Sequence, residues 1–415
     1  MRPGGRPRAA RWARLAAAGV VRTRGAVPAV LRAIVRVTAA GLLAVVAGHA
    51  PPAVAPAFAQ AASTPEGRAA SGPHRERAGD PRPLVRPVPL VFERLRAADL
   101  GLVVNLRDPY SAAVGAYYAR QRGLRPEQIL YVELPVQPVL GPDEFERLSR
   151  AIEQHFDFRT QALALAWSAP YAVGCNSITG AVTLGYDAAL CRHTCGASRV
   201  SLYANSRSGR PYTEFRMRPS MLLASRSVDE AKAMIDRGVA ADGTLTLPDA
   251  EPADAVFASL GDGARNVRAV FYPAERVLVR PPVRLRRADS VPAAAAARRA
   301  VLMTAGTARI DGLTDAGWVP GALADHLTSF GGDLQGGHGQ STVLDWLASG
   351  VTASHGSVSE PCNHLHKFPQ PQWLLGHYLQ GATAIEAYWK SVLWPQQSLF
   401  VGEPLAAPFA RIDRP

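Results

Sequence analysis

Short apolar runs alternate with amphipathic segments in the first half of the chain. Residues 100–106 (LGLVVNL), 129–135 (ILYVELP) and 161–170 (QALALAWSAP) have the length and composition of buried strands. Between them, residues 111–123 carry apolar side chains at helical spacing, and residues 141–156 open with acidic residues, which suit the start of a helix. An order of strand, helix, strand, helix, strand is typical of a parallel sheet with helical crossovers.

The second half of the chain continues this alternation less regularly. Residues 220–238 predict a strand followed by a helix that Ser227 caps and Gly238 ends. Further strands are predicted at residues 267–273, 301–306, 351–356 and 398–405, and further helices at residues 320–332, 373–381 and 383–394. The pattern predicts an α/β fold whose mostly parallel sheet has helices on both faces. One domain over residues 96–410 would hold these elements, and two lobes divided near residues 245–290 would also fit.

Residues 1–59 have the features of a signal peptide with a long basic region. They contain nine arginines and no acidic residue, then an apolar stretch at residues 37–48 and an A-x-A cleavage pattern at residues 57–59. The apolar stretch is too short to span a bilayer comfortably. Residues 60–95 are rich in Pro, Arg, Gly and Ser and predict a disordered linker. We therefore expect an exported protein, periplasmic or secreted, with no integral membrane segment after cleavage; a disordered basic tail is the alternative.

The formal net charge of +12 does not indicate a nucleic-acid partner. Nine of the 46 basic residues lie in the predicted signal peptide, which leaves 37 basic against 34 acidic residues in the rest of the chain. That near balance offers no basic face to a phosphate backbone. No glycine-rich phosphate loop follows the strand at residues 100–106, so nucleotide binding is disfavoured as well.

The four cysteines are even in number, which favours disulfides in an exported protein. Three lie in one loop-like segment, and the fourth is far away in the sequence. A bridge inside the first segment would close a short loop, whereas a bridge to the distant cysteine would staple the C-terminal region to the N-terminal half. The candidates are Cys175, Cys191, Cys195 and Cys362.

The stretch SHGSVSEPCNHLHKFP, residues 354–369, concentrates residues that can carry chemistry. A cysteine hydrolase needs a thiolate whose pKa is lowered by a nearby imidazole, together with donors for the oxyanion. His355, Cys362 and Glu360 are the catalytic candidates, with His338 of the GGHG segment as an alternative base. The competing interpretation is a disulfide at Cys362 with His355 shaping a turn, and export favours this second interpretation.

A metal site is a further interpretation of the same stretch. His355, His364 and His366 flank Cys362, and His193 lies between two other cysteines. Zinc accepts such mixtures of ligands, but the chain has neither a CxxC pair nor an HExxH motif. We therefore predict no metal site and no cofactor, and structural zinc is a minor alternative.

Polar side chains follow several of the predicted strands. Ligands of open parallel sheets bind beyond the carboxyl ends of the strands, so these side chains are candidates for a binding rim. Whether they converge there depends on the topology of the sheet. Ser111 has a simpler explanation as the N-cap of the helix that follows Asp108 and Pro109. The binding candidates are Asn105, Asp108, Tyr110, Tyr171 and Asp311.

Long motifs of the chain resemble a family of exported bacterial proteins that occurs in species with exosortase-type protein-sorting systems. The motifs include LVVNLRDPYSAAVGAYYARQRGL, DWLASGVTASHGSVSEPC and EAYWKSVLWPQQSLFVGEPLAAPF, and the resemblance runs from about residue 100 to residue 409. It implies export and an association with envelope sorting, and it implies no particular reaction.

A weaker resemblance is to gingipain-like peptidases of the caspase fold. In that family a strand, a GA-rich turn, a helix with Glu-Ala and a G-[DE]-P segment close the catalytic domain, and GVTASHGS, TAIEAYWKS and FVGEPL follow in that order here. The peptidases also carry a His-Gly and a Cys at successive strand ends before the GA-rich turn. In this chain VLMTAGTARIDG has no cysteine, and GGHG places its His-Gly on a glycine-rich loop. The resemblance therefore implies the fold without implying the catalytic dyad.

Three functions remain open at this level. The first is an exported protein linked to envelope sorting whose biochemical activity the sequence does not reveal. The second is a cysteine-dependent, peptidase-like hydrolase that uses Cys362 and a histidine. The third is a disulfide- or metal-stabilised module that binds an unknown peptide, protein or glycan.

Overall fold

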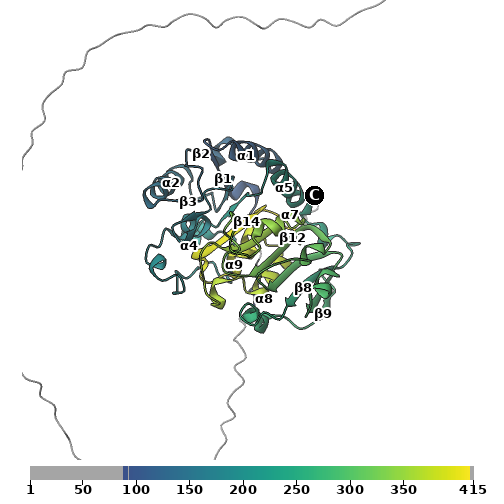
Figure 1. Ribbon diagram of the computed structural model, residues 1–415. Helices are drawn as coiled ribbons and strands as arrows, with labels where there is room; N and C mark the ends of the chain where they lie inside the picture. Colours follow the sequence, from purple (N-terminus) through teal and green to yellow (C-terminus); the bar gives the residue numbers. More distant parts are fainter. Residues whose placement is uncertain (1–86, 92, 412–415) are drawn as a thin grey trace, which may run out of the picture. The chain divides into compact units, whose positions relative to one another are not determined.

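The computed structural model describes residues 87–91 and 93–411 and contains one large sheet (Figure 1). The predicted signal peptide and most of the predicted linker lie outside the described residues. The sheet has eleven strands in the order β2-β1-β4-β7-β14-β13-β12-β11-β8-β10-β9, and a second sheet has three strands in the order β3-β5-β6. The prediction of an α/β fold with a mostly parallel sheet is confirmed.

The strands of the large sheet are β1 (Leu100–Asn105), β2 (Ile129–Val132), β4 (Ala162–Leu165), β7 (Ser220–Leu222), β8 (Ala253–Ser259), β9 (Arg276–Leu278), β10 (Val283–Ala288), β11 (Ala300–Gly306), β12 (Trp318–Leu327), β13 (Ala353–Ser357) and β14 (Ser398–Gly402). The small sheet contains β3 (Val139–Leu140), β5 (Ala172–Val173) and β6 (Asn176–Ser177).

The α-helices are α1 (Pro109–Arg122), α2 (Pro142–His155), α3 (Ile178–Leu184), α4 (Pro211–Phe215), α5 (Val228–Ala241), α6 (Val291–Ala295), α7 (Val343–Ala348), α8 (Pro371–Leu379) and α9 (Ala384–Ser391). The 3₁₀ helices are η1 (Ala97–Asp99), η2 (Pro126–Gln128), η3 (Leu190–Arg192), η4 (Thr244–Thr246), η5 (Asn266–Phe271), η6 (Leu313–Asp315), η7 (Leu365–Lys367) and η8 (Pro395–Gln397). None of these helices is long and apolar enough to cross a bilayer.

The large sheet has two halves of parallel strands, and at one edge β9 is antiparallel to β10. The strands β2, β1, β4, β7 and β14 are parallel to one another, and so are β13, β12, β11, β8 and β10. The two halves meet at the antiparallel pair of β13 and β14, where Ala353 pairs with Gly402 and Ser357 with Ser398. Segments that follow strands of the two halves also meet, because Tyr171 after β4 donates to Asp333 after β12 at 2.6 Å.

Helices cover both faces of the sheet, as the sequence predicted. Successive side chains of a strand point to opposite faces. In β1 the side chain of Val104 lies against Gly115 of α1, whereas Gly101 lies against the ring of Phe156 at the end of α2. The helices α1 and α2 therefore pack on opposite faces of β1, which is the arrangement that right-handed crossovers produce when the chain reverses direction across the sheet.

Local signals explain where the long helices begin and end. The backbone N–H of Tyr110 donates to Oδ1 of Asp108 at 3.0 Å, so Asp108 caps α1. The prediction of Ser111 as the cap is wrong, because its hydroxyl instead accepts from the N–H of Asn105 at 2.8 Å. Ser227 caps α5 as predicted, with its Oγ accepting from the N–H of Glu230. The helix continues past Gly238 to Ala241, so Gly238 does not end it.

Two predicted elements have the wrong type. Residues 320–332 were predicted as a helix, but residues up to Leu327 form strand β12. This strand lies between two others and is buried on both faces, so it lacks the alternation that identifies a half-exposed strand. Residues 267–273 were predicted as a strand, but η5 occupies most of them, and the strand of this region is β8, earlier in the chain.

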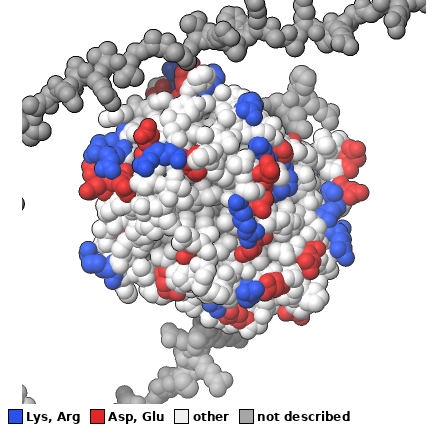
Figure 2. Space-filling model, turned by 45° about the horizontal axis from the view of Figure 1, so that its top comes forward, with Lys and Arg blue, Asp and Glu red and all other residues white. Residues whose placement is uncertain are grey.

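The domain begins earlier than predicted and is not divided into lobes. Residues 87–91 and 93–95 contact its core: the N–H of Val91 donates to Gln380 at 2.9 Å, and the N–H of Leu95 donates to Glu386 at 3.1 Å. These residues are therefore not a linker. The described residues fall in one compact unit, and no boundary falls near residues 245–290. On the face drawn in Figure 2, basic and acidic side chains lie side by side without a large area of one sign.

Candidate functional site

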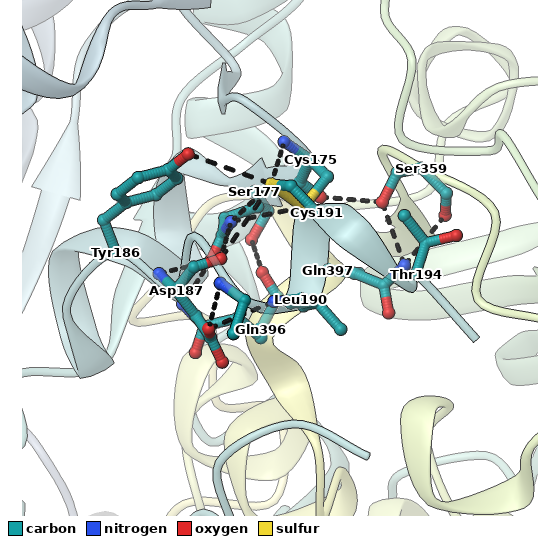
Figure 3. The surroundings of a disulfide bond; sticks show 12 residues. Cys175, Ser177, Tyr186, Asp187, Leu190, Cys191, Thr194, Ser359, Gln396 and Gln397 are labelled. Atoms are coloured by element: carbon teal, nitrogen blue, oxygen red, sulfur yellow. Dashed lines mark hydrogen bonds between the residues drawn. A yellow bond between two sulfur atoms is a disulfide. The ribbon is translucent and has the colours of Figure 1, made fainter. Parts of the chain in front are cut away.

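The stretch at residues 354–369 begins inside the sheet and continues into a stapled loop. Strand β13 ends at Ser357, and Cys362 in the following turn is bonded to Cys195. Cys175 is bonded to Cys191, and the surroundings of this second disulfide are drawn in Figure 3. The four candidate cysteines therefore all form disulfides, and the distant cysteine staples the two regions together.

The disulfide changes the role of two catalytic candidates. A thiolate is the nucleophile of a cysteine hydrolase, and Cys362 in its bonded form supplies none. Glu360 accepts a hydrogen bond from the backbone N–H of Cys362 at 2.8 Å. Cys362 itself has a φ of 53°, in the left-handed region, so the Glu360 carboxylate and the disulfide both hold this turn. In this state the two residues shape a loop.

The third catalytic candidate, His355, lies in the core. Its Nε2 is 3.0 Å from the hydroxyl of Ser398, and its ring packs against Phe368 and Phe400. Burial lowers the pKa of His355 well below its ordinary value, and the nearby charge of Arg268 lowers it further. The imidazole is therefore neutral and enclosed at neutral pH. Its position inside a central strand keeps its side chain away from solvent.

A buried ion pair lies beside His355. Asp325 of β12 is its neighbour across the strands, and the guanidinium of Arg268 donates to Asp325 at 2.7 Å. Burial raises the pKa of Asp325, and Arg268 opposes this effect. The side chains of Asp325 and His326 are both buried, in the segment that the sequence predicted as a helix.

His326 anchors the loop that follows β12. Its Nδ1 accepts from the indole N–H of Trp346 at 3.0 Å, so its Nε2 is the protonated nitrogen and donates to the carbonyl of Ser341 at 3.1 Å. Burial lowers the pKa of His326 to about 4. A neutral histidine thus ties β12 and α7 to the far end of the loop at residues 328–341.

The binding candidates after β1 have structural roles. Asn105 exchanges hydrogen bonds with the backbone of Leu134, at 3.1 and 2.9 Å. Asp108 caps α1, and the hydroxyl of Tyr110 donates to the carbonyl of Leu223 at 2.9 Å. Burial raises the pKa of Tyr110 to about 12. These contacts hold β1 and α1 in place, and Asp311 lies in the loop after β11.

Tyr171, in the segment after β4, contacts a residue that the sequence did not suggest. Its hydroxyl donates to Oδ1 of Asp333 at 2.6 Å, and Oδ2 of Asp333 is 3.0 Å from Nε2 of His338. The His338 ring stacks on Phe330 with ring centroids 4.0 Å apart. Burial raises the pKa of Tyr171, and its hydrogen bond to Asp333 adds to this. This network joins the segment after β4 to the loop after β12.

Asp311 lines a hollow beside this loop, which we call the rim hollow. It encloses about 470 Å³ and lies where β11 and β12 end and α7 begins. Two ion pairs, Arg309 with Asp311 and Arg226 with Asp345, stand in its lining. Hydrogen bonding to Arg309 lowers the pKa of Asp311. The rim hollow is lined by Arg226, Arg309, Ile310, Asp311, Thr314, Gln340, Ser341, Asp345, Ala348 and Ser349.

Hydrogen bonds fix the loop that forms one side of the rim hollow. Oε1 of Gln340 accepts from the hydroxyl of Thr328 at 2.6 Å and from the N–H of Phe330 at 2.9 Å. The hydroxyl of Ser341 accepts from the N–H of Ile310 at 3.2 Å. Arg226 and Asp345 were missed by the sequence analysis. The rule that ligands gather at strand ends could have found Arg226, which follows β7, whereas Asp345 carried only the signal of a helix cap.

The histidines and cysteines proposed as metal ligands make other contacts. The rings of His364 and His366 lie against Trp394, at 6.4 and 4.7 Å between centroids. The cysteines on either side of His193 are both in disulfides. Over residues 87–91 and 93–411, no three side chains of His, Cys, Asp or Glu are grouped so that they could hold a metal ion.

Comparison of the chain with protein-family models, with curated proteins and with solved structures finds no match.

Proposed function

We propose that this chain is an exported, disulfide-stabilised binding module that holds a charged peptide segment in the rim hollow. The observation that carries the proposal is the lining itself, because two guanidinium groups and two carboxylates stand around one concave surface. A peptide with both acidic and basic side chains can exchange its own charges with these pairs, and its backbone can bond to groups such as the Gln340 amide.

The chemistry of the lining favours a peptide over a glycan. Binding sites for sugars often use the face of an aromatic ring, which the lining of the rim hollow does not contain. Arginines that can form two parallel hydrogen bonds with a carboxylate are suited to acidic side chains and to a chain terminus. The resemblance to exosortase-associated proteins supports a setting in the cell envelope, where the ligand would be a segment of another exported protein.

The disulfide at Cys362 favours a binding module over a cysteine hydrolase. The hydrolase would need a free thiol beside an accessible imidazole, whereas Cys362 is bridged and His355 is buried. The order of β13, α9 and β14 with the following Gly402-Glu403-Pro404 segment agrees with the order of motifs in the gingipain-like resemblance. We infer that a peptidase-like scaffold can serve for binding where the thiol chemistry is absent.

An array of synthetic peptides of about ten residues with mixed charges tests the proposal. The oxidised protein is applied at low salt, and binding is compared with that of the double variant Arg226→Gln/Arg309→Gln. We expect the variant to lose about tenfold or more in affinity for the bound peptides, because two charged contacts are removed. The matched control is Arg147→Gln/Arg150→Gln, which makes the same charge change on the exposed side of α2.

Two results would contradict the proposal. One is equal loss of binding in the α2 control, which would indicate a non-specific charge effect. The other is binding of neutral glycans, and of no peptides, by the wild-type protein.

A further inference from the structure

The outermost strand of the sheet has an unoccupied side. Strand β9 pairs only with β10, in an antiparallel hairpin, and no described strand follows it in the sheet order. Two apolar side chains of this region are exposed, Val277 at 66% and Val279 at 82%. An edge strand presents unpaired backbone N–H and C=O groups, and natural proteins usually protect such an edge. In Figure 1 the label of β9 lies at the margin of the sheet, beyond β8.

Arginines surround a hollow next to this strand, which we call the edge hollow. It encloses about 620 Å³ and is lined by Asp254, Glu275, Arg276, Val277, Arg284, Leu285, Arg286, Ala296 and Arg298. Its four arginines face two carboxylates. The edge hollow is therefore net positive, unlike the near-neutral domain around it.

The two carboxylates of the edge hollow already have partners. Asp254 accepts from Arg284 at 2.7 Å and lies 3.6 Å from Arg286. Glu275 accepts from the backbone N–H of Arg287 at 2.9 Å. Within the described residues, Arg276 and Arg298 have no carboxylate partner. These two guanidinium groups are the ones left to meet an external anion.

We propose that β9 is a docking edge for an extended acidic peptide of another protein, which adds to the sheet as one more strand. The open edge supplies backbone hydrogen bonds, and the arginines select the charge of the partner. This surface involves no residue of the rim hollow, so the inference stands apart from the function proposed above.

The register of the strands predicts the pattern of the ligand. Arg276 and Val277 are consecutive residues of β9, so their side chains point to opposite faces of the sheet; Arg276 pairs with Leu285 and Val277 with Arg284. Every second side chain of an added strand points to the same face. The matching ligand carries Glu or Asp at alternate positions, on the face of Arg276, and β-branched residues on the face of Val277.

Fluorescence anisotropy with a labelled peptide tests this inference. The probe is Thr-Glu-Val-Glu-Val-Glu-Val-Thr, and the protein is the oxidised exported chain at low salt. We expect Arg276→Gln/Arg298→Gln to weaken binding about tenfold, because both unpaired guanidinium groups are removed. The control variant Arg147→Gln/Arg150→Gln and the rim-hollow variant Arg226→Gln/Arg309→Gln should bind as the wild type does. A peptide with Lys at each Glu position should not bind.

A second peptide separates strand addition from simple charge attraction. Proline at the central valine removes one backbone donor and cannot continue a strand ladder, so we expect binding to fall by at least about tenfold. Hydrogen exchange at residues 276–279 should slow when the parent peptide binds. The inference is overturned if the proline peptide binds as tightly as the parent, if the edge and α2 variants lose affinity equally, or if the parent peptide does not bind.

Discussion

Replacement of Gly356 by alanine should unfold the protein more easily and displace the loop that forms the rim hollow. Gly356 lies in β13 directly after His355, and the chain passes it at very close range. A Cβ at this position would lie 2.3 Å from the carbonyl carbon of Gly331 and 2.4 Å from the nitrogen of Gly332. Both are backbone atoms, so no side-chain rotation can relieve the overlap. The glycine that follows the catalytic candidate His355 thus has a packing reason.

The expected loss in the free energy of unfolding follows from the type of contact. Inserting a methyl group into a well-packed site typically costs 1–3 kcal/mol, and the rigid backbone at Gly331 places this site at the upper end, about 3 kcal/mol. The N–H of Gly332 also donates to the carbonyl of Ser357 at 2.8 Å, and a shift would weaken that bond. Asp333 follows directly, so its contact with Tyr171 should loosen as well.

Urea unfolding, followed by tryptophan fluorescence, measures the change in the free energy of unfolding. The matched control is Gly263→Ala, since nothing lies within 4 Å of a Cβ at Gly263. We expect the control to stay within about 0.5 kcal/mol of the wild type. Hydrogen exchange at residues 331–341 should rise in Gly356→Ala alone. Equal unfolding midpoints and equal exchange in the two variants would refute the reasoning about backbone contact.

Three further predictions concern buried charge, pH and the disulfides. Glu403 is buried and accepts from Arg122 at 2.6 and 3.0 Å, so Glu403→Gln should cost about 3–5 kcal/mol in urea unfolding, whereas the exposed Glu133→Gln should cost almost nothing. Burial lowers the pKa of His326 from 6.5 to about 4, so below pH 6.5 the unfolded chain takes up a proton that the folded chain does not. His326 should therefore lower the free energy of unfolding by about 3 kcal/mol between pH 6.5 and pH 4. His326→Gln should make the free energy of unfolding less dependent on pH over this range. Cys195 and Cys362 are 167 residues apart in the sequence, whereas Cys175 and Cys191 are 16 apart. Because the longer loop restricts the unfolded chain more, Cys195→Ala/Cys362→Ala should lower the free energy of unfolding by about 5 kcal/mol, against about 3 kcal/mol for Cys175→Ala/Cys191→Ala. Equal losses would contradict this loop-entropy argument.

The sequence predicted the first half of the fold well because its signals are local. The strands β1, β2 and β4 are separate apolar runs, and the helices between them have clear starts, such as Asp108 before Pro109. The strand β12 was missed because a strand buried on both faces resembles a buried helix in its composition. No local signal reveals that β14 runs antiparallel to β13, since pairing direction depends on partners distant in sequence.

The candidate site was predicted only in part for the same reason. Asp311 and His338 were singled out, and both lie at the carboxyl ends of the second half of the sheet, in or beside the rim hollow. Asn105, Asp108 and Tyr110 have structural roles instead, which no local signal distinguishes from ligand binding. Disulfide pairing could not be derived, because four cysteines allow three pairings and spacing does not choose among them. Charged pairs such as Arg226 with Asp345 join segments more than a hundred residues apart.

Peptide mapping of the exported protein by mass spectrometry, with and without reduction, tests most directly whether the stretch after β13 is a stapled scaffold. The account predicts cross-linked peptides for Cys195 with Cys362 and for Cys175 with Cys191, and no alkylation at Cys362 before reduction. Alkylation of Cys362 in the unreduced protein would contradict the account and restore a thiol nucleophile to this loop.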